Sequence, residues 1–96
     1  MTTVIVSHHV ADFAAWRTVF EEHGTERAKH GCTSAEVLRG VADGNDVTII
    51  MGYPSPAQAD AFLTDPSLKE AMGQAGVDGA PDIRVLEAAD QGASLS

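Results

Sequence analysis

The segment DFAAWRTVFEEHGTERAKH, residues 12–30, predicts a long amphipathic helix with an unusual buried face. Its large side chains recur every three or four residues, which places them on one side of a helix. This face carries Phe13, Trp16, Phe20, His23 and Arg27. Three aromatic rings are typical of a core stripe, but a buried histidine and arginine need a partner or a ligand. The pattern therefore predicts a small-molecule pocket between this helix and a sheet.

Clear signals mark both ends of this helix. Residues 3–8 before it are rich in β-branched side chains and predict a first strand, after which Asp12 is a natural N-cap. Gly24 interrupts the helix and Gly31 ends it. The N-terminal third of the chain is thus a strand followed by an interrupted helix.

A hairpin is predicted next along the chain. Residues 34–40 and 46–53 are two strand segments, and the sequence ADGN at residues 42–45 supplies turn chemistry between them. These two strands therefore pair antiparallel.

The second helical region has two start signals. Ser55 is an N-cap, Pro56 takes the first helical position, and Gln58 three residues after the serine predicts a capping box. Asp65 followed by Pro66 repeats the cap-then-proline signal, so the helix breaks there and restarts.

The C-terminal part is predicted to contain one more strand. Glycines and Pro81 within residues 73–81 predict a loop, and residues 83–87 the last strand. The small, polar residues 91–96 predict a flexible tail, which leaves residues 1–90 as a single domain.

The predicted order is β-α-β-β-α-β, the α+β ferredoxin-like or split-βαβ arrangement. It implies a four-stranded antiparallel sheet with two helices on one face. Residues 4–6 and 49–51 are apolar at consecutive positions, so these strands are apolar on both faces. We therefore expect a homodimer in which the uncovered faces of two sheets meet.

Composition excludes several functional classes. The 96 residues include six Lys or Arg and fourteen Asp or Glu, a formal charge of −8, which argues against binding to nucleic acid. The sequence shows no basic amphipathic helix, membrane span or signal peptide. Cys32 is the only cysteine, which excludes an internal disulfide and favours a reducing compartment. We expect a cytoplasmic protein that does not associate with membranes.

Residues spread over nearly the whole chain carry a family resemblance. They are His8, Asp12-Phe13 with Trp16, His23 with Arg27, Asp43, Asn45, Ala61-Phe62, Leu68, Glu70-Ala71-Met72, Ala75-Gly76-Val77 and Pro81. In these positions the chain resembles the dimeric α/β-barrel superfamily, which includes the antibiotic biosynthesis monooxygenase-like proteins. Within it, the chain is similar to small actinobacterial proteins described as monooxygenase-like or cyclase-like.

The resemblance implies a pocket between sheet and helices in each subunit, and dimerisation through the opposite sheet face. The superfamily includes oxygenases, cyclases, haem degraders and decarboxylases, so the fold alone does not define the reaction. Haem-degrading members use an Asn, a Trp and a His in elements where this chain has His8-His9, Tyr53 and no histidine. Haem degradation is therefore not expected. The quinone-forming oxygenases of this fold need no cofactor, and we expect none here.

The candidate catalytic residues are His8, His23 and Arg27. His8 and His9 point to opposite faces of a strand, so one of them faces the helices, and the resemblance favours His8. A neutral imidazole can exchange a proton, as both phenol oxygenation and aldol cyclisation require. The alternative is that both histidines sit at a strand end, satisfied by backbone or water.

Arg27 and His23 are four residues apart and so stack on one helical face. The planar guanidinium of Arg27 suits a carboxylate, enolate or phenolate and can stabilise a developing oxyanion. The structural alternative is a salt bridge from Arg27 to a carboxylate, with Asp12, Asp60 and Glu87 as the candidates.

Aromatic residues are the candidate substrate-binding groups. They are Trp16, Phe20 and Phe62, which form either a wall against a flat substrate or an ordinary core, and Tyr53, which either donates to a substrate carbonyl or caps the sheet edge. No recognised metal-site spacing is present, so we expect no metal.

These features favour a cofactor-independent monooxygenase-like or cyclase-like enzyme acting on a small aromatic or polyketide-like molecule. The alternative is a non-catalytic small-molecule-binding or accessory homodimer. Free volume beside Arg27 discriminates between them.

Overall fold

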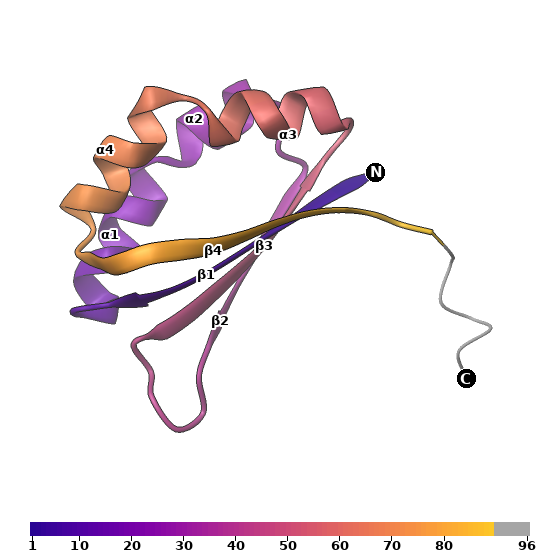
Figure 1. Ribbon diagram of the computed structural model, residues 1–96. Coiled ribbons are helices and arrows are strands. Elements are labelled where there is room, and N and C mark those ends of the chain that lie inside the picture. The colour runs from indigo at the N-terminus through magenta and orange to yellow at the C-terminus, as the bar shows by residue number, and fades with distance from the viewer. Residues whose placement is uncertain (90–96) are drawn as a thin grey trace.

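The computed structural model describes residues 1–89, which form one sheet with all helices on one side (Figure 1). The predicted flexible tail, residues 91–96, lies outside the described residues. The elements in chain order are β1 (Thr2–Val10), α1 (Phe13–Glu22), α2 (Gly24–Lys29), β2 (Ser34–Arg39), β3 (Asp46–Tyr53), α3 (Pro56–Leu63), α4 (Pro66–Gln74) and β4 (Val77–Glu87).

The sheet has the strand order β2-β3-β1-β4, and all neighbouring strands are antiparallel. The two predicted helical regions are each divided, at His23 between α1 and α2 and at Asp65 between α3 and α4. This topology confirms the α+β ferredoxin-like fold with a four-stranded antiparallel sheet and helices on one face.

The core lies between the helices and the sheet and follows from the alternation of β1 and β3. Every second residue of β1, from Thr2 to Val10, is buried, and so is every second residue of β3 from Val47 to Tyr53. Trp16 of α1 and Phe62 of α3 complete this layer, with 3% and 2% of their surface exposed. Burying each such apolar side chain stabilises the fold by about 1.5–3 kcal/mol.

The predicted helix starts are confirmed. The side chains of Asp12, Ser55 and Asp65 each accept a hydrogen bond from a backbone N–H two or three residues further on, at 3.2, 3.3 and 2.9 Å. The reciprocal half of the predicted capping box differs, because the Gln58 side-chain oxygen accepts a bond from the Ser55 hydroxyl, at 3.0 Å. All three caps satisfy backbone donors that a helix start leaves free.

The last strand is longer than the sequence predicted. β4 begins at Val77, which pairs with Val10, so residues 77–82 belong to the sheet and not to a loop. The pairing register shifts between Ser7 and His9 of β1, where Gly79 has a φ of 77°. Glycine and proline therefore mark an irregularity in an edge strand, where both are tolerated, and not its end.

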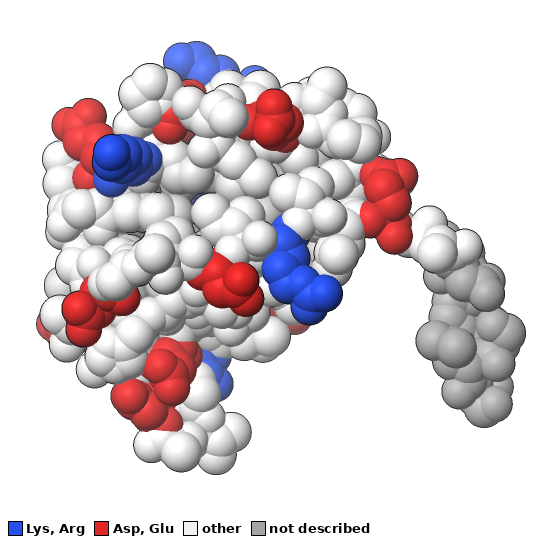
Figure 2. Space-filling model, in the orientation of Figure 1, with Lys and Arg blue, Asp and Glu red and all other residues white. Residues whose placement is uncertain are grey.

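Acidic groups outnumber basic ones on this chain, fourteen to six. Figure 2 shows acidic side chains dispersed over the visible face. Such a surface repels polyanions at long range.

Candidate functional site

A cavity of about 50 Å³ lies between the helices and the inner face of the sheet. His23 and Arg27 are the ionisable residues among its lining, and the other lining side chains are apolar. The predicted aromatic groups Trp16, Phe20 and Phe62 also line it. The cavity has room for water but is far below the roughly 300–1,000 Å³ of a typical ligand pocket. A drug-sized ligand would therefore enter only if the surrounding helices moved apart.

Arg27 lies on the cavity wall and has no carboxylate partner in the part of the chain that the structure describes. Its guanidinium carbon lies 3.7 Å from the centre of the Phe20 ring, and its Nη1 donates a hydrogen bond to the Phe20 carbonyl at 2.8 Å. Within residues 1–89 no ion pair joins it to a carboxylate, including the three candidates considered above. Burial lowers the pKa of Arg27, yet a guanidinium remains charged near neutrality. The wall thus presents a positive charge that a ligand anion can neutralise.

Gly24 makes room for this guanidinium. A Cβ atom at position 24 would lie 3.2 Å from Nη2 of Arg27, tighter than an ordinary contact. From the sequence, Gly24 was predicted only as a helix interruption. The contact of the Arg27 guanidinium with Phe20 of α1, for which Gly24 leaves space, is visible only in the structure.

His23 lies at the junction of α1 and α2 and lines the same cavity. Its ring centre is 5.9 Å from that of Phe62, and its Nε2 is 3.1 Å from the Ser67 hydroxyl. Burial, followed by the nearby charge of Arg27, lowers the pKa of His23. A neutral imidazole that can accept a proton is therefore the dominant form near pH 7.

His8 is placed on the helix-covered face of β1, as the resemblance implied, but behind the cavity wall. Only 8% of it is exposed, and its ring packs edge-on against Trp16 with 5.8 Å between centres. Neither ring nitrogen has a hydrogen-bond partner among the described residues, and burial lowers the pKa of His8. Trp16 therefore separates this imidazole from the cavity.

Tyr53 is also absent from the cavity wall. It is fully buried and stacks behind Phe62, with 5.7 Å between ring centres. Its hydroxyl lies 3.9 Å from the Met51 sulfur, and burial raises the pKa of Tyr53. A direct contact of Tyr53 with a ligand would require Phe62 to move.

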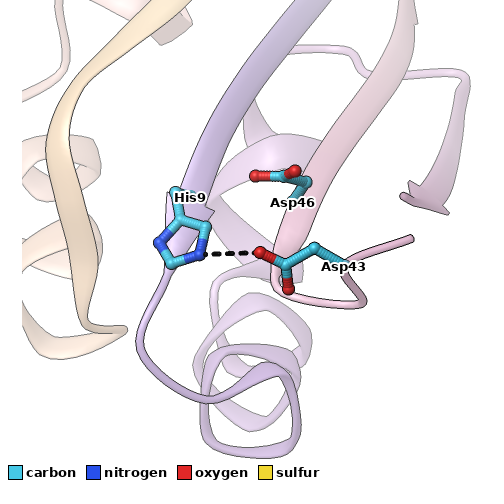
Figure 3. Close-up of side chains that lie close together, drawn as sticks. All are labelled: His9, Asp43 and Asp46. Atoms are coloured by element: carbon cyan, nitrogen blue, oxygen red, sulfur yellow. Dashed lines mark hydrogen bonds and ion pairs between the residues drawn. The ribbon is translucent and has the colours of Figure 1, made fainter. Parts of the chain in front are cut away.

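A separate cluster lies on the outer side of β1, as Figure 3 shows. His9 faces Asp43 across 3.3 Å, and its other ring nitrogen is 3.5 Å from Asp78. Asp46 is close enough for His9, Asp43 and Asp46 to surround a cation together. All three are solvent-exposed, and the His9–Asp43 contact also attaches the hairpin loop to β1. His9 is 34 residues from Asp43, so no local pattern indicated this cluster.

Sequence comparison matches the chain to no family model and to no curated protein. Its fold, however, matches solved structures over nearly the whole chain. SnoaB, a cofactor-independent oxygenase from Streptomyces nogalater, superposes with a TM-score of 0.78 at 15% identity, covering 94% of each chain.

Two further structures give the same result. An antibiotic biosynthesis monooxygenase has a TM-score of 0.73 at 14% identity, covering 94% of this chain and all of its own. A protein from Mycobacterium tuberculosis has a TM-score of 0.68 at 18% identity, covering 95% of this chain and 98% of its own. These likenesses establish that this chain has the fold found in antibiotic biosynthesis monooxygenases.

Proposed function

We propose that this protein is a cofactor-independent, monooxygenase-like or cyclase-like enzyme that acts on a small aromatic or polyketide-like molecule. The observation that carries the proposal is the guanidinium of Arg27, which has no carboxylate partner within residues 1–89 and lies beside neutral His23 on an otherwise apolar wall. SnoaB, a cofactor-independent oxygenase, shares this fold, so the fold can host such chemistry, while the site residues carry the proposal.

The chemistry begins with one proton transfer. His23 takes the proton of a phenol, or of a carbon next to a carbonyl, and the electron pair stays on the substrate as a phenolate or enolate. Arg27 donates hydrogen bonds to the oxygen that gains the negative charge. In an oxygenation the activated carbon attacks dioxygen, and the peroxide anion that forms takes the proton from His23; where that carbon carries a second hydrogen, the hydroperoxide loses water, which breaks the O–O bond and leaves a carbonyl. In a cyclisation the carbon attacks a second carbonyl of the substrate, whose oxygen takes the proton from His23 and becomes a hydroxyl.

The aromatic wall would orient a flat substrate. Trp16, Phe20 and Phe62 line the cavity, and aromatic side chains favour contact with planar molecules. Because the cavity is small, substrate entry requires a separation of the helices around it. Displacement of Trp16 would bring His8 to the substrate, and displacement of Phe62 would bring Tyr53, the two predicted site residues that lie behind the wall.

The enzyme would act as a homodimer through the outer face of the sheet. Ile5 and Ile50 are cross-strand partners on that face, and the pairing register places Leu38 and Leu86 there as well. Leu38 and Leu86 are 44% and 37% exposed in the single chain. Burial of these side chains against a second copy would be favourable.

A cytoplasmic location remains part of the proposal and is supported by the lone Cys32. Within residues 1–89, no helix has the length and apolar character needed to cross a bilayer.

A non-catalytic small-molecule-binding or accessory dimer is the second candidate. The small volume of the cavity favours the accessory role, because a closed site holds neither substrate nor ligand at rest. This candidate predicts binding of a ligand without product.

The experiment compares Arg27→Ala with Arg17→Ala, an exposed arginine of α1 paired with Glu21 at 3.1 Å. A panel of one- to three-ring phenols and β-diketones is tested for binding by protein NMR, and for turnover by oxygen uptake and product analysis. We expect Arg27→Ala to lower turnover by about 100-fold or more while the protein stays folded, and Arg17→Ala to have no effect.

The other outcomes are informative. Binding that depends on Arg27 without any product would select the non-catalytic candidate. An unfolded Arg27→Ala protein, or activity unaffected by the change, would contradict the proposed role of Arg27.

A further inference from the structure

Three metal-ligating side chains meet where α2 lies against the start of α4. Glu26 belongs to α2, His30 is the C-cap of that helix, and Asp65 is the N-cap of α4. One ligand atom from each lies within 4.8 Å of the other two, and all three residues are half-buried. None of the three is among the residues that line the cavity. They therefore form a second cluster of chemical groups, separate from the candidate site.

Two of these groups are already held facing each other. Asp65 uses Oδ1 to accept the Ser67 backbone N–H at 2.9 Å and so caps α4, while its Oδ2 lies 2.8 Å from Nε2 of His30. The His30 ring packs edge-on against the buried ring of Phe62, with 5.9 Å between centres. The helix cap and the ring contact thus orient a carboxylate oxygen and an imidazole nitrogen toward one point.

The distances are compatible with an ion at that point. Zinc binds imidazole nitrogen and carboxylate oxygen at about 2.0–2.2 Å in a tetrahedron, so two of its ligands lie about 3.3 Å apart. The His30–Asp65 contact of 2.8 Å would widen slightly as the ion takes the place of the shared hydrogen. Glu26, four residues before His30 on the same helical face, would supply the third ligand by a small movement of its side chain.

The charges and the donor atoms favour a divalent ion. Two carboxylates share one imidazole, and the ion pair that Glu26 makes among the described residues is with Lys29, at 3.7 Å. Lys29 is 72% exposed, and such a surface pair contributes little. A divalent ion would neutralise both carboxylates at once. One nitrogen and two oxygen donors suit zinc, whereas calcium and magnesium prefer oxygen ligands alone.

The cluster of His9, Asp43 and Asp46 is the natural comparison (Figure 3). Its ligand atoms are equally close, but all three residues are exposed. Exposed side chains must be ordered when an ion binds, at a cost in conformational entropy. The half-buried cluster is therefore expected to bind more tightly, and the exposed one provides matched control variants.

We propose that Glu26, His30 and Asp65 form a zinc site that links α2 to the start of α4, with water as the fourth ligand. The sequence prediction of no metal rested on spacing along the chain. It did not include Asp65, which is 35 residues from His30 and meets it only in the fold. The inference does not depend on the proposed function, because these ligands lie outside the cavity lining.

The test titrates the full chain, free of tags and of metal, with Zn²⁺ alone near neutral pH by isothermal titration calorimetry. We expect one ion per chain with a Kd of about 10 μM or tighter, and a higher thermal midpoint in its presence. His30→Ala and Glu26→Gln should each weaken binding by about 100-fold. Asp65→Asn, which keeps an oxygen for the helix cap, should have the same effect.

His9→Ala and Cys32→Ser are the controls. The first removes the imidazole of the exposed cluster, and the second removes a thiol two residues from His30 that bonds the Ser34 carbonyl at 3.2 Å. Both should leave the affinity for Zn²⁺ unchanged. Glu26→Gln keeps the shape of a partly exposed side chain, so it tests the site even if His30→Ala does not fold.

Three results would overturn the proposal. The absence of Zn²⁺ binding would leave His30 and Asp65 as an ion pair only. Binding that His9→Ala or Cys32→Ser abolishes would place the ion on other ligands. Binding that neither Glu26→Gln nor Asp65→Asn weakens would exclude these carboxylates from the site.

Discussion

The two faces of the sheet differ in what covers them. The inner face, with Val4, Val6 and Met51, is sealed by the helices, whereas no helix among residues 1–89 covers the outer face, with Ile5 and Ile50 (Figure 1). Both sets alternate along the same strands. These strands are therefore apolar on both faces. One face is buried by the helices of the same chain, and the other would be buried only against a second surface.

Two adjacent histidines show the same contrast at the level of single residues. His8 points inward and has no hydrogen-bond partner among the residues the structure describes, while His9 points outward and faces two carboxylates. A buried imidazole without a partner costs stability, so the inner face carries a polar group that packing alone does not explain.

The largest expected effect is on the inner face. Phe62→Ala should lower the free energy of unfolding by about 3–5 kcal/mol, because it leaves a cavity beside Tyr53. Leu38→Ala on the outer face removes a side chain that is 44% exposed in the single chain, and should cost less than about 1.5 kcal/mol. Urea denaturation measures both, and equal losses would show that the outer face is sealed as tightly as the inner one.

The next effect concerns association through the outer face. Ile50→Arg should weaken dimerisation by about 100-fold or more, because it replaces the apolar cross-strand partner of Ile5 with a charge at the proposed interface. Val41→Arg is the control, since Val41 is fully exposed in the hairpin loop. Sedimentation equilibrium at several concentrations measures the dissociation constant. If the unaltered protein is a monomer at all concentrations, the proposed homodimer is contradicted.

The smallest effect compares the neighbouring histidines. His8→Leu should raise the free energy of unfolding by about 1 kcal/mol at pH 7, because an apolar side chain of similar size replaces an unpartnered imidazole. His9→Leu should not stabilise the protein, since it removes an exposed ring that faces Asp43.

The sign of the pH dependence follows from the lowered pKa of His8. Below about pH 6.5 the unfolded chain takes up a proton at His8 that the folded chain resists, so the unaltered protein loses stability as the pH falls. His8→Leu lacks this loss, and its advantage should therefore grow between pH 7 and pH 5 in urea titrations. An advantage that shrinks over this range would contradict the buried, neutral state of His8.

Much of the fold could be predicted because its signals are local. The caps at Asp12, Ser55 and Asp65 depend on a few neighbouring residues, and each is where the sequence predicted it. The break predicted at Gly24 lies one residue earlier, at His23, and Gly24 begins α2. The start of β4 was missed because the glycines and Pro81 were interpreted as a loop. Pairing with β1 overrides that local preference, and Gly79 absorbs the irregularity.

The candidate site was predictable only in part. The spacing of His23 and Arg27 placed both on one helical face, and the structure brings both to the cavity. His8, however, lies behind Trp16, and Tyr53 lies behind Phe62, as seen from the cavity. The spacing of residues along the sequence does not show which side chain lies in front of another. Ser67 is 44 residues from His23, so no local pattern could join them.

By itself, the sequence determined the element order, the helix caps and the alternation of two central strands, because hydrogen-bond caps and side-chain periodicity act over a few residues. Only the tertiary structure decided which groups reach the cavity. The return of Arg27 onto the Phe20 ring, the contact of His23 with Ser67 and the isolation of His8 all depend on how separate elements pack. Packing depends on contacts between elements that are far apart in the sequence, and the local spacing of residues does not show these contacts.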